Sequence, residues 1–111
     1  MDIKSSPATY ATVCSVPGLN FQPINESVEL LKNSSIDYEF RTTVVKQYHT
    51  AKTFKDIGLY LKGARKYYLQ SFTDSENVPD HTLGSYSKEE LSDFRDLLLE
   101  YIPIVELRGI D

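Results

Sequence analysis

Short runs of aromatic and β-branched residues alternate along this chain with segments of helical periodicity, and this alternation constrains the fold more than any other feature. In the clearest run, Tyr38, Phe40 and Val44 are residue types that favour strands. The other runs have a similar composition, and the first of them reads as the end of a strand. The expected strands occupy residues 1–4, 38–45, 65–72 and 104–109.

Between these runs, apolar residues recur at the spacing of one buried helix face. Phe54, Ile57 and Leu61 form such a stripe, and Gly63 lies where a helix commonly ends. "SKEE", which begins at Ser87, is a capping box that opens the clearest helix. The helices are expected at about 7–13, 23–34, 53–64 and 88–101. This order predicts an α/β fold, with a parallel sheet of about four strands joined by helical crossovers.

Polar residues share one face of each expected strand, because side chains alternate across a strand. In the second strand, Glu39, Arg41 and Thr43 lie on one side, opposite an apolar side that includes Phe40 and Val44. The other strands repeat the pattern with Asp2 and Lys4, with Tyr68 and Gln70, and with Glu106 and Arg108. A barrel interior or the open concave face of a curved sheet would explain this pattern, with helices packed on the outer face.

Two readings of these charges stay open. Each charge can be a strand-end residue that reaches solvent, or the charges can line a ligand site near the strand ends. Buried charges need partners, so a paired network is expected, and such a network could be purely structural. Its members would be Asp2, Lys4, Glu39, Arg41, Glu106 and Arg108.

The 111 residues correspond to a single domain, and the formal net charge is −4. A net negative charge does not favour binding to nucleic acid or to an anionic membrane. No apolar run approaches the length of a membrane-spanning helix, and "MDIKSSPATY" has no signal-peptide segment. These features predict a cytoplasmic protein with no nucleic-acid partner and no membrane partner.

The residues that commonly hold metals are few. Cys14 is the one cysteine, so the chain cannot form an internal disulfide or supply the thiolates of a zinc or iron–sulfur site. We expect Cys14 to be a partly buried residue at a helix end, and His49 and His81 to be surface residues in polar loops. The sequence also contains no glycine-rich phosphate loop and no pairing of a nucleophile with a base.

Seven segments in a fixed order carry a family resemblance. They are "MDIK", "VPGLN", "SVELLKNSSIDYEFRTTVV", "HTAKTFKDIG", "LKGARKYYLQSF", "YSKEEL" and "VELRG". Together they resemble the C-terminal half of radical S-adenosylmethionine activating enzymes, above all the activating proteins of anaerobic ribonucleoside-triphosphate reductase, which are relatives of pyruvate formate-lyase activating enzymes. The resemblance covers essentially the whole chain, and "MDIK" and "YEFRTTVV" are its most specific parts.

The resemblance implies a partial, half (β/α)6 barrel of the TIM-like kind. In the full-length family a [4Fe–4S] cluster binds S-adenosylmethionine, and the resulting 5′-deoxyadenosyl radical abstracts hydrogen from a glycine of the partner glycyl radical enzyme, here an anaerobic ribonucleotide reductase. By the same resemblance, Asp2 would lie near the methionine moiety or a monovalent cation, and Lys4 would contact S-adenosylmethionine. Arg41 would reach its carboxylate or the partner's glycine loop, and Gln70 would lie near the cofactor.

The chain also departs from the family pattern. The three cluster cysteines and a glycine-rich segment of the N-terminal half are absent, and Lys46 stands where the family usually has proline. We therefore expect residues 1–111 to be one domain without the cluster-binding half, to bind no cofactor alone and to be inactive alone. The alternatives are a free-standing α/β binding or interaction domain without catalysis, or one chain of a split enzyme. An uncovered sheet edge or face would also allow a homodimer.

Overall fold

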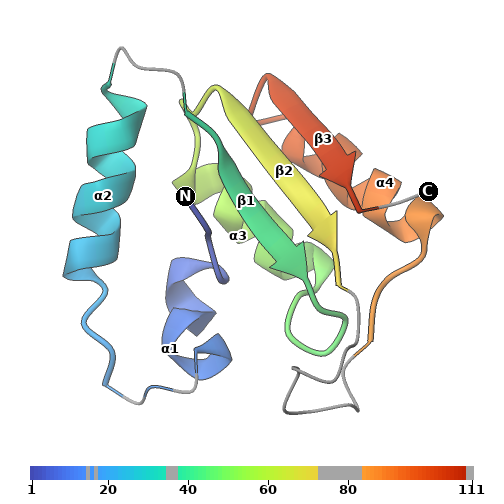
Figure 1. Ribbon diagram of the computed structural model, residues 1–111, viewed down its shortest axis with the longest axis horizontal. Helices are drawn as coiled ribbons and strands as arrows, with labels where there is room; N and C mark the ends of the chain where they lie inside the picture. The colour runs from blue at the N-terminus through green and yellow to red at the C-terminus, as the bar shows by residue number, and fades with distance from the viewer. Residues whose placement is uncertain (15, 17, 35–37, 73–83, 110–111) are drawn as a thin grey trace.

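The computed structural model describes residues 1–14, 16, 18–34, 38–72 and 84–109. Within them, β1, β2 and β3 lie side by side and pair in parallel in that order (Figure 1). The prediction of an α/β fold with a parallel sheet and helical crossovers is confirmed. The elements in chain order are η1 (Pro7–Thr9), α1 (Tyr10–Val13), α2 (Gln22–Lys32), β1 (Phe40–Val44), α3 (Ala51–Tyr60), β2 (Lys66–Ser71), α4 (Lys88–Leu98) and β3 (Ile104–Arg108).

Capping boxes fix the first turns of α3 and α4. In α4 the Ser87 side chain accepts a hydrogen bond from the Glu90 N–H, and Glu90 accepts one from the Ser87 N–H, as the sequence predicted. In α3 the same exchange joins Thr50 and Thr53. This second box starts α3 at Ala51, earlier than expected, and Gly63 at a φ of 97° turns the chain after the helix.

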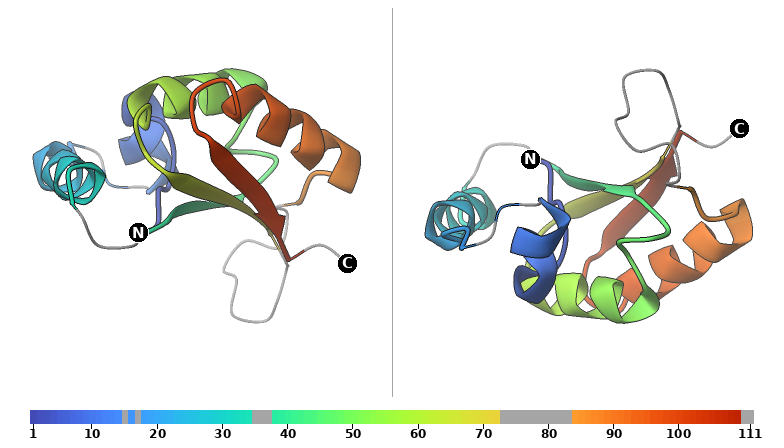
Figure 2. Two further views of the ribbon diagram at one scale, coloured as in Figure 1. Left: turned by 90° about the horizontal axis from the view of Figure 1, so that it is seen from above. Right: turned by 90° about the horizontal axis from the view of Figure 1, so that it is seen from below.

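One face of the sheet is covered by helices and holds the core. α3 and α4, which form the two crossovers, both lie on this face (Figure 2). Phe40 of β1, Leu69 of β2 and Phe54 of α3 are all fully buried there. α4 adds Leu91 and Leu98 to the same cluster. The helix stripes and the strand parity expected from the sequence therefore meet in one core.

α2 packs at the side of the molecule, beyond the edge formed by the first residues (Figures 1 and 2). Phe21, just before α2, makes edge-to-face ring contacts with Tyr10 and Tyr60 at centroid distances of 5.3 and 5.6 Å. Tyr60 also donates a hydrogen bond to Asn25 of α2 at 2.7 Å. These contacts join α2 to α1 and α3.

The first residues run parallel to β1 but make only one isolated bridge, between Asp2 and Arg41. The Ile3 N–H donates to the Arg41 carbonyl at 2.7 Å, and the Arg41 N–H donates to the Met1 carbonyl at 3.0 Å. The chain then turns into η1, where Pro7 has no N–H to offer a ladder. The sheet of the described residues is thus three-stranded and open, and the fourth strand predicted at residues 1–4 is not confirmed, since this segment only makes a single bridge beside β1.

A buried pair of hydroxyl groups ties this segment to the sheet. Thr42 Oγ1 donates a hydrogen bond to the Ile3 carbonyl at 2.6 Å. The Thr42 hydroxyl has only one proton, so the hydrogen bond between Thr42 and Tyr67 must be donated by the Tyr67 hydroxyl. Thr42 and Tyr67 are both fully buried, so the Tyr67 hydroxyl and the Ile3 carbonyl both depend on Thr42 for a partner.

Candidate functional site

The second face of the sheet is polar, and no helix of the described residues covers it (Figure 2). In β1 the side chains of Phe40, Thr42 and Val44 are buried, whereas Arg41 and Thr43 between them are exposed. The parity predicted for this strand is therefore confirmed. The polar side faces outward because the apolar side is occupied by α3 and α4.

Strand register places the polar side chains in rows across the face. Arg41 lies opposite Tyr68, and Tyr68 lies opposite Glu106. Thr43, Gln70 and Arg108 form the next row toward the strand C-termini. We call this surface the open face. It carries Asp2, Lys4, Glu39, Arg41, Thr43, Lys66, Tyr68, Gln70, Ile104, Glu106 and Arg108.

Three of the four predicted site residues come together on the open face. Asp2 is the bridge partner of Arg41, and Lys4 Nζ lies 2.6 Å from Asp2 Oδ2. Within the described part of the chain, the Arg41 guanidinium makes no ion pair or hydrogen bond. Gln70 shares the face but is separated from Asp2 and Lys4 by β1. Arg41 is therefore a cation that has no ion-pair partner among the described residues, and it lies beside the ion pair of Asp2 and Lys4.

The expected six-residue charge network does not form as one unit. Glu39 and Arg108 make a second pair, with Glu39 Oε2 3.0 Å from Arg108 Nη1. Arg108 reaches Glu39 by folding over Tyr68, with its Cζ 3.6 Å from the ring centroid. Among the described residues, Glu106 makes no ion pair. The network divides because Asp2 lies beside β1 at one edge of the sheet, so β1 and β2 separate it from Glu106 and Arg108 of β3.

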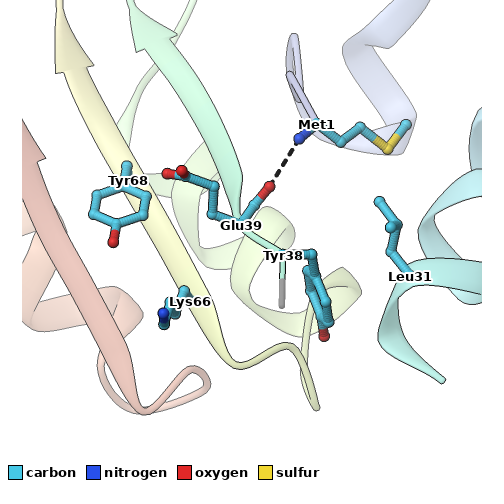
Figure 3. Close-up of a pocket in the computed structure, with 6 residues that line it drawn as sticks. All are labelled: Met1, Leu31, Tyr38, Glu39, Lys66 and Tyr68. Carbon is cyan, nitrogen blue, oxygen red and sulfur yellow. Dashed lines mark hydrogen bonds between the residues drawn. The ribbon is translucent and has the colours of Figure 1, made fainter. Parts of the chain in front are cut away.

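A pocket of about 310 Å³ lies at the end of the open face where the strands begin (Figure 3). Glu39, Lys66 and Tyr68 line it on the sheet side, and Leu31 of α2 lines it on the other side. The Tyr38 hydroxyl is buried and makes no hydrogen bond within the described structure. This pocket is at the opposite end of the strands from the position at which parallel sheets usually bind ligands.

A larger pocket, of about 510 Å³, lies beyond the C-terminal end of β1. We call it the C-terminal pocket. Asp2 and Lys4 line it together with Thr43, and Cys14 and Phe72 supply part of its apolar wall. Ligands of open α/β sheets bind outside the carboxyl ends of the strands. A small ligand that carries both a positive and a negative group would therefore meet complementary side chains here.

The prediction that His49 is a surface residue is wrong. Its ring is 1% exposed, packs on Phe54 and lies in the wall of the C-terminal pocket. Its Nδ1 accepts a hydrogen bond from the Val45 N–H at 3.0 Å, and its Nε2 lies 2.7 Å from the Lys4 carbonyl oxygen. Burial lowers the pKa of His49 below its ordinary value, although the hydrogen bond to the Lys4 carbonyl opposes the shift. His81 lies outside the described residues.

This lowered pKa predicts a loss of stability in mild acid. The unfolded chain takes up a proton at His49 as the pH falls through 6.5, while the folded chain resists it. The stability that neutral His49 contributes is therefore complete above pH 6.5 and is lost as the pH falls toward the lowered folded pKa. Urea unfolding at pH 5.5 and 7.5 measures the loss.

The control for this prediction is His49→Gln, which cannot titrate and retains His81. The difference in unfolding free energy between the two pH values should be smaller in His49→Gln than in the wild type. The ionisable groups around the ring, Asp2, Lys4, Cys14 and Tyr48 in the pocket and Tyr86 on the His49 carbonyl, are the same in both proteins. An equal pH dependence would contradict the assignment.

Potential metal ligands are sparse among the described residues. In the described residues no group of three or more His, Cys, Asp or Glu side chains could hold a metal ion. Cys14 is free and half-buried at the end of α1, which confirms the prediction for it. One cysteine in the whole sequence does not fit a [4Fe–4S] cluster, which needs several thiolates.

No protein-family model, no curated protein and no solved structure matches this chain. The helices of the described residues are all too short or too polar to cross a lipid bilayer. The sequence motifs and the side chains of the open face are therefore the features of this chain that bear on its function.

Proposed function

We propose that this chain forms the C-terminal half of a radical S-adenosylmethionine activating protein of the anaerobic ribonucleoside-triphosphate reductase type, acting in the cytoplasm. The motifs that resemble this family span the chain from "MDIK" to "VELRG". The observation that carries the proposal is the meeting of Asp2, Lys4 and Arg41 on the uncovered face of a parallel sheet. The family resemblance implies a ligand-binding role for each of these three residues.

The side chains on the open face suit the charges of S-adenosylmethionine. The Arg41 guanidinium suits its carboxylate, because the planar guanidinium can donate two parallel hydrogen bonds. The Asp2 carboxylate suits its ammonium group or a monovalent cation, and Lys4 and Gln70 would contact the same ligand from either side of Arg41. When bound, S-adenosylmethionine supplies the adenosyl group on which the chemistry of the family depends.

In the proposed assembly, the iron–sulfur cluster would be bound by the other half of the barrel. The open three-stranded sheet, extended by residues 1–3, would be one half of a (β/α)6 barrel, and the cluster-bearing half would complete it. The glycine-bearing loop of the partner reductase would then approach the same open face. In this arrangement the chain binds and orients, and it performs no chemistry by itself.

Iron–sulfur reconstitution of the isolated chain should leave it colourless. The chain can supply one thiolate, from Cys14, which is too few for a stable cluster. The measurement is the visible absorption spectrum, together with iron and sulfide analysis, after anaerobic incubation with iron, sulfide and a thiol reductant. Stoichiometric iron and sulfide with charge-transfer absorption would contradict the prediction.

The proposed function is tested by supplying the missing half. The chain is mixed anaerobically with the cluster-bearing N-terminal half of a family member, a reductant and S-adenosylmethionine, and 5′-deoxyadenosine is measured. We expect product only when both halves are present. Arg41→Ala should lower it by about tenfold or more, since a lost charge-assisted hydrogen bond has roughly that effect. Arg95→Ala, at a half-buried position of α4 away from the open face, is the matched control and should leave the yield unchanged.

The alternative is a binding domain without catalysis, and the uncovered open face favours it as a second candidate. Ile104 is an exposed apolar residue on that face, at 41%, and could be covered by another copy of the chain. Association of the two halves without any 5′-deoxyadenosine would overturn the proposal. A homodimer by sedimentation that excludes the cluster-bearing half would favour the binding domain.

A further inference from the structure

The backbone around Lys4 is held mainly by side chains. Beyond the bridge of Asp2 and Arg41, the Lys4 N–H donates to the Tyr10 hydroxyl at 3.3 Å, which is a long hydrogen bond. The Lys4 carbonyl lies 2.7 Å from His49 Nε2, a much shorter contact. Thr42 holds the Ile3 carbonyl at 2.6 Å on one side of Lys4, and His49 is the contact that holds the Lys4 carbonyl on the other side.

Only one form of the His49 ring satisfies both of its contacts. Nδ1 accepts a hydrogen bond from the Val45 N–H, so Nδ1 carries no proton. The Lys4 carbonyl can only accept, so Nε2 must carry the proton and donate it. The neutral Nε2–H tautomer therefore connects the loop after β1 to the Lys4 backbone, and both ring nitrogens have a partner.

We infer that His49 is a positioning residue that sets the place of Lys4 at the C-terminal pocket. His49 and Lys4 both line this pocket, and the Lys4 ammonium pairs with Asp2 at its rim. By fixing the Lys4 backbone, His49 fixes the point from which the ammonium reaches the ligand. The role of Lys4 in binding S-adenosylmethionine comes from the proposed function, but the positioning itself is a property of the folded chain.

Two variants separate the contacts of the ring. In His49→Gln the amide nitrogen lies near the position of Nε2 and can still donate to the Lys4 carbonyl. In His49→Asn the amide oxygen lies near the position of Nδ1 and can accept from Val45, but the side chain is too short to reach Lys4. Ile57→Val, a buried change in α3, provides a destabilised protein in which both His49 contacts are intact.

The readout is amide hydrogen exchange in the full chain. In His49→Asn, exchange of the Ile3 and Lys4 amides should rise by about tenfold relative to the Leu69 amide of β2, which is the effect of one lost hydrogen bond. His49→Gln should restore most of the protection. Ile57→Val should change the three amides together. Equal protection in both His49 variants, or a uniform change across all amides in His49→Asn, would overturn the inference.

A second measurement keeps this result separate from the proposed function. With the unlabelled cluster-bearing half of a family member present, S-adenosylmethionine binding is followed by amide chemical shifts in the wild type, His49→Gln and His49→Asn. We expect His49→Asn to bind more weakly and His49→Gln to bind like the wild type. A wild type that does not bind S-adenosylmethionine would contradict the proposed function, while the exchange result would still decide whether His49 positions Lys4. A wild type that binds, with both variants unchanged, would overturn the role of His49 in binding.

Discussion

Thr42→Val is expected to lower the free energy of unfolding by about 2–5 kcal/mol, because it leaves two buried polar groups without partners. The Ile3 carbonyl loses its donor, and the fully buried Tyr67 hydroxyl loses its acceptor. Stabilities of small domains are of order 5–15 kcal/mol, so the variant could be largely unfolded at moderate temperature. Urea denaturation followed by circular dichroism measures the loss.

Two controls test the direction of these hydrogen bonds. Thr42→Ser keeps the hydroxyl and should cost about 1 kcal/mol for its lost methyl group. Tyr67→Phe should also cost about 1 kcal/mol, since Thr42 still donates to Ile3. The double variant of Thr42→Val and Tyr67→Phe should be no less stable than Thr42→Val alone. Fully additive losses, or a Thr42→Val as stable as Thr42→Ser, would contradict the assigned chain of donors.

Gly58→Ala should lower the free energy of unfolding by about 1–3 kcal/mol, the usual cost of overpacking a core. In an ordinary helix the same change would stabilise by about 1 kcal/mol. Here a Cβ at position 58 would lie 2.5 Å from Cδ2 and 3.1 Å from Cγ of Tyr101. Cγ and Cδ2 are close to the Tyr101 backbone, so the ring cannot move away from position 58 without a shift of that backbone.

The partner of Gly58 can be removed to test this cause. In a Tyr101→Ala background the space is open, and Gly58→Ala should then be neutral or stabilising. Lys55→Ala, at an exposed position of the same helix, is the control for helix propensity and should change stability by less than about 0.5 kcal/mol. If Gly58→Ala were stabilising with Tyr101 present, the close approach of α3 to the segment after α4 would be wrong.

The order of elements could be predicted because its signals are local. Phe54, Ile57 and Leu61 repeat at helical spacing within a few residues, and all three are fully buried. The box from Ser87 to Glu90 is a pattern of four residues, and it opens α4 as expected. The start of α3 was missed because Thr53 replaces the usual Glu or Gln of a capping box.

Much of the open face could also be predicted, because strand parity needs only a period of two. Arg41 and Gln70 lie on the open face, as the alternation of side chains along each strand predicted. Pairing across the face needs the register between strands, which local patterns do not contain. For this reason Glu39 meets Arg108 over Tyr68 in the structure, whereas the sequence suggested one network.

The role of His49 could not be predicted from the sequence. Its partners are the backbone N–H of Val45 and the backbone carbonyl of Lys4. Because nearly every residue type has these backbone groups, the sequence does not indicate which of them a side chain will meet. Lys4 is also 45 positions away, so only the folded chain brings it to the ring. A histidine between polar residues is typical of an exposed loop, so only the tertiary contacts of His49 show that it is buried.

Titration of the ¹⁵N-labelled full chain with S-adenosylmethionine, in the presence of the unlabelled cluster-bearing half of a family member, tests the proposed binding face most directly. The proposed function predicts saturable chemical-shift changes at Asp2, Lys4 and Arg41, with smaller changes at Gln70, and their loss in Arg41→Ala. The pocket of about 290 Å³ between α3 and α4, lined by Ala51 and Phe94 among others, is the internal control and should not respond. Changes confined to that pocket, or no changes at millimolar ligand, would contradict the proposal that the open face binds S-adenosylmethionine.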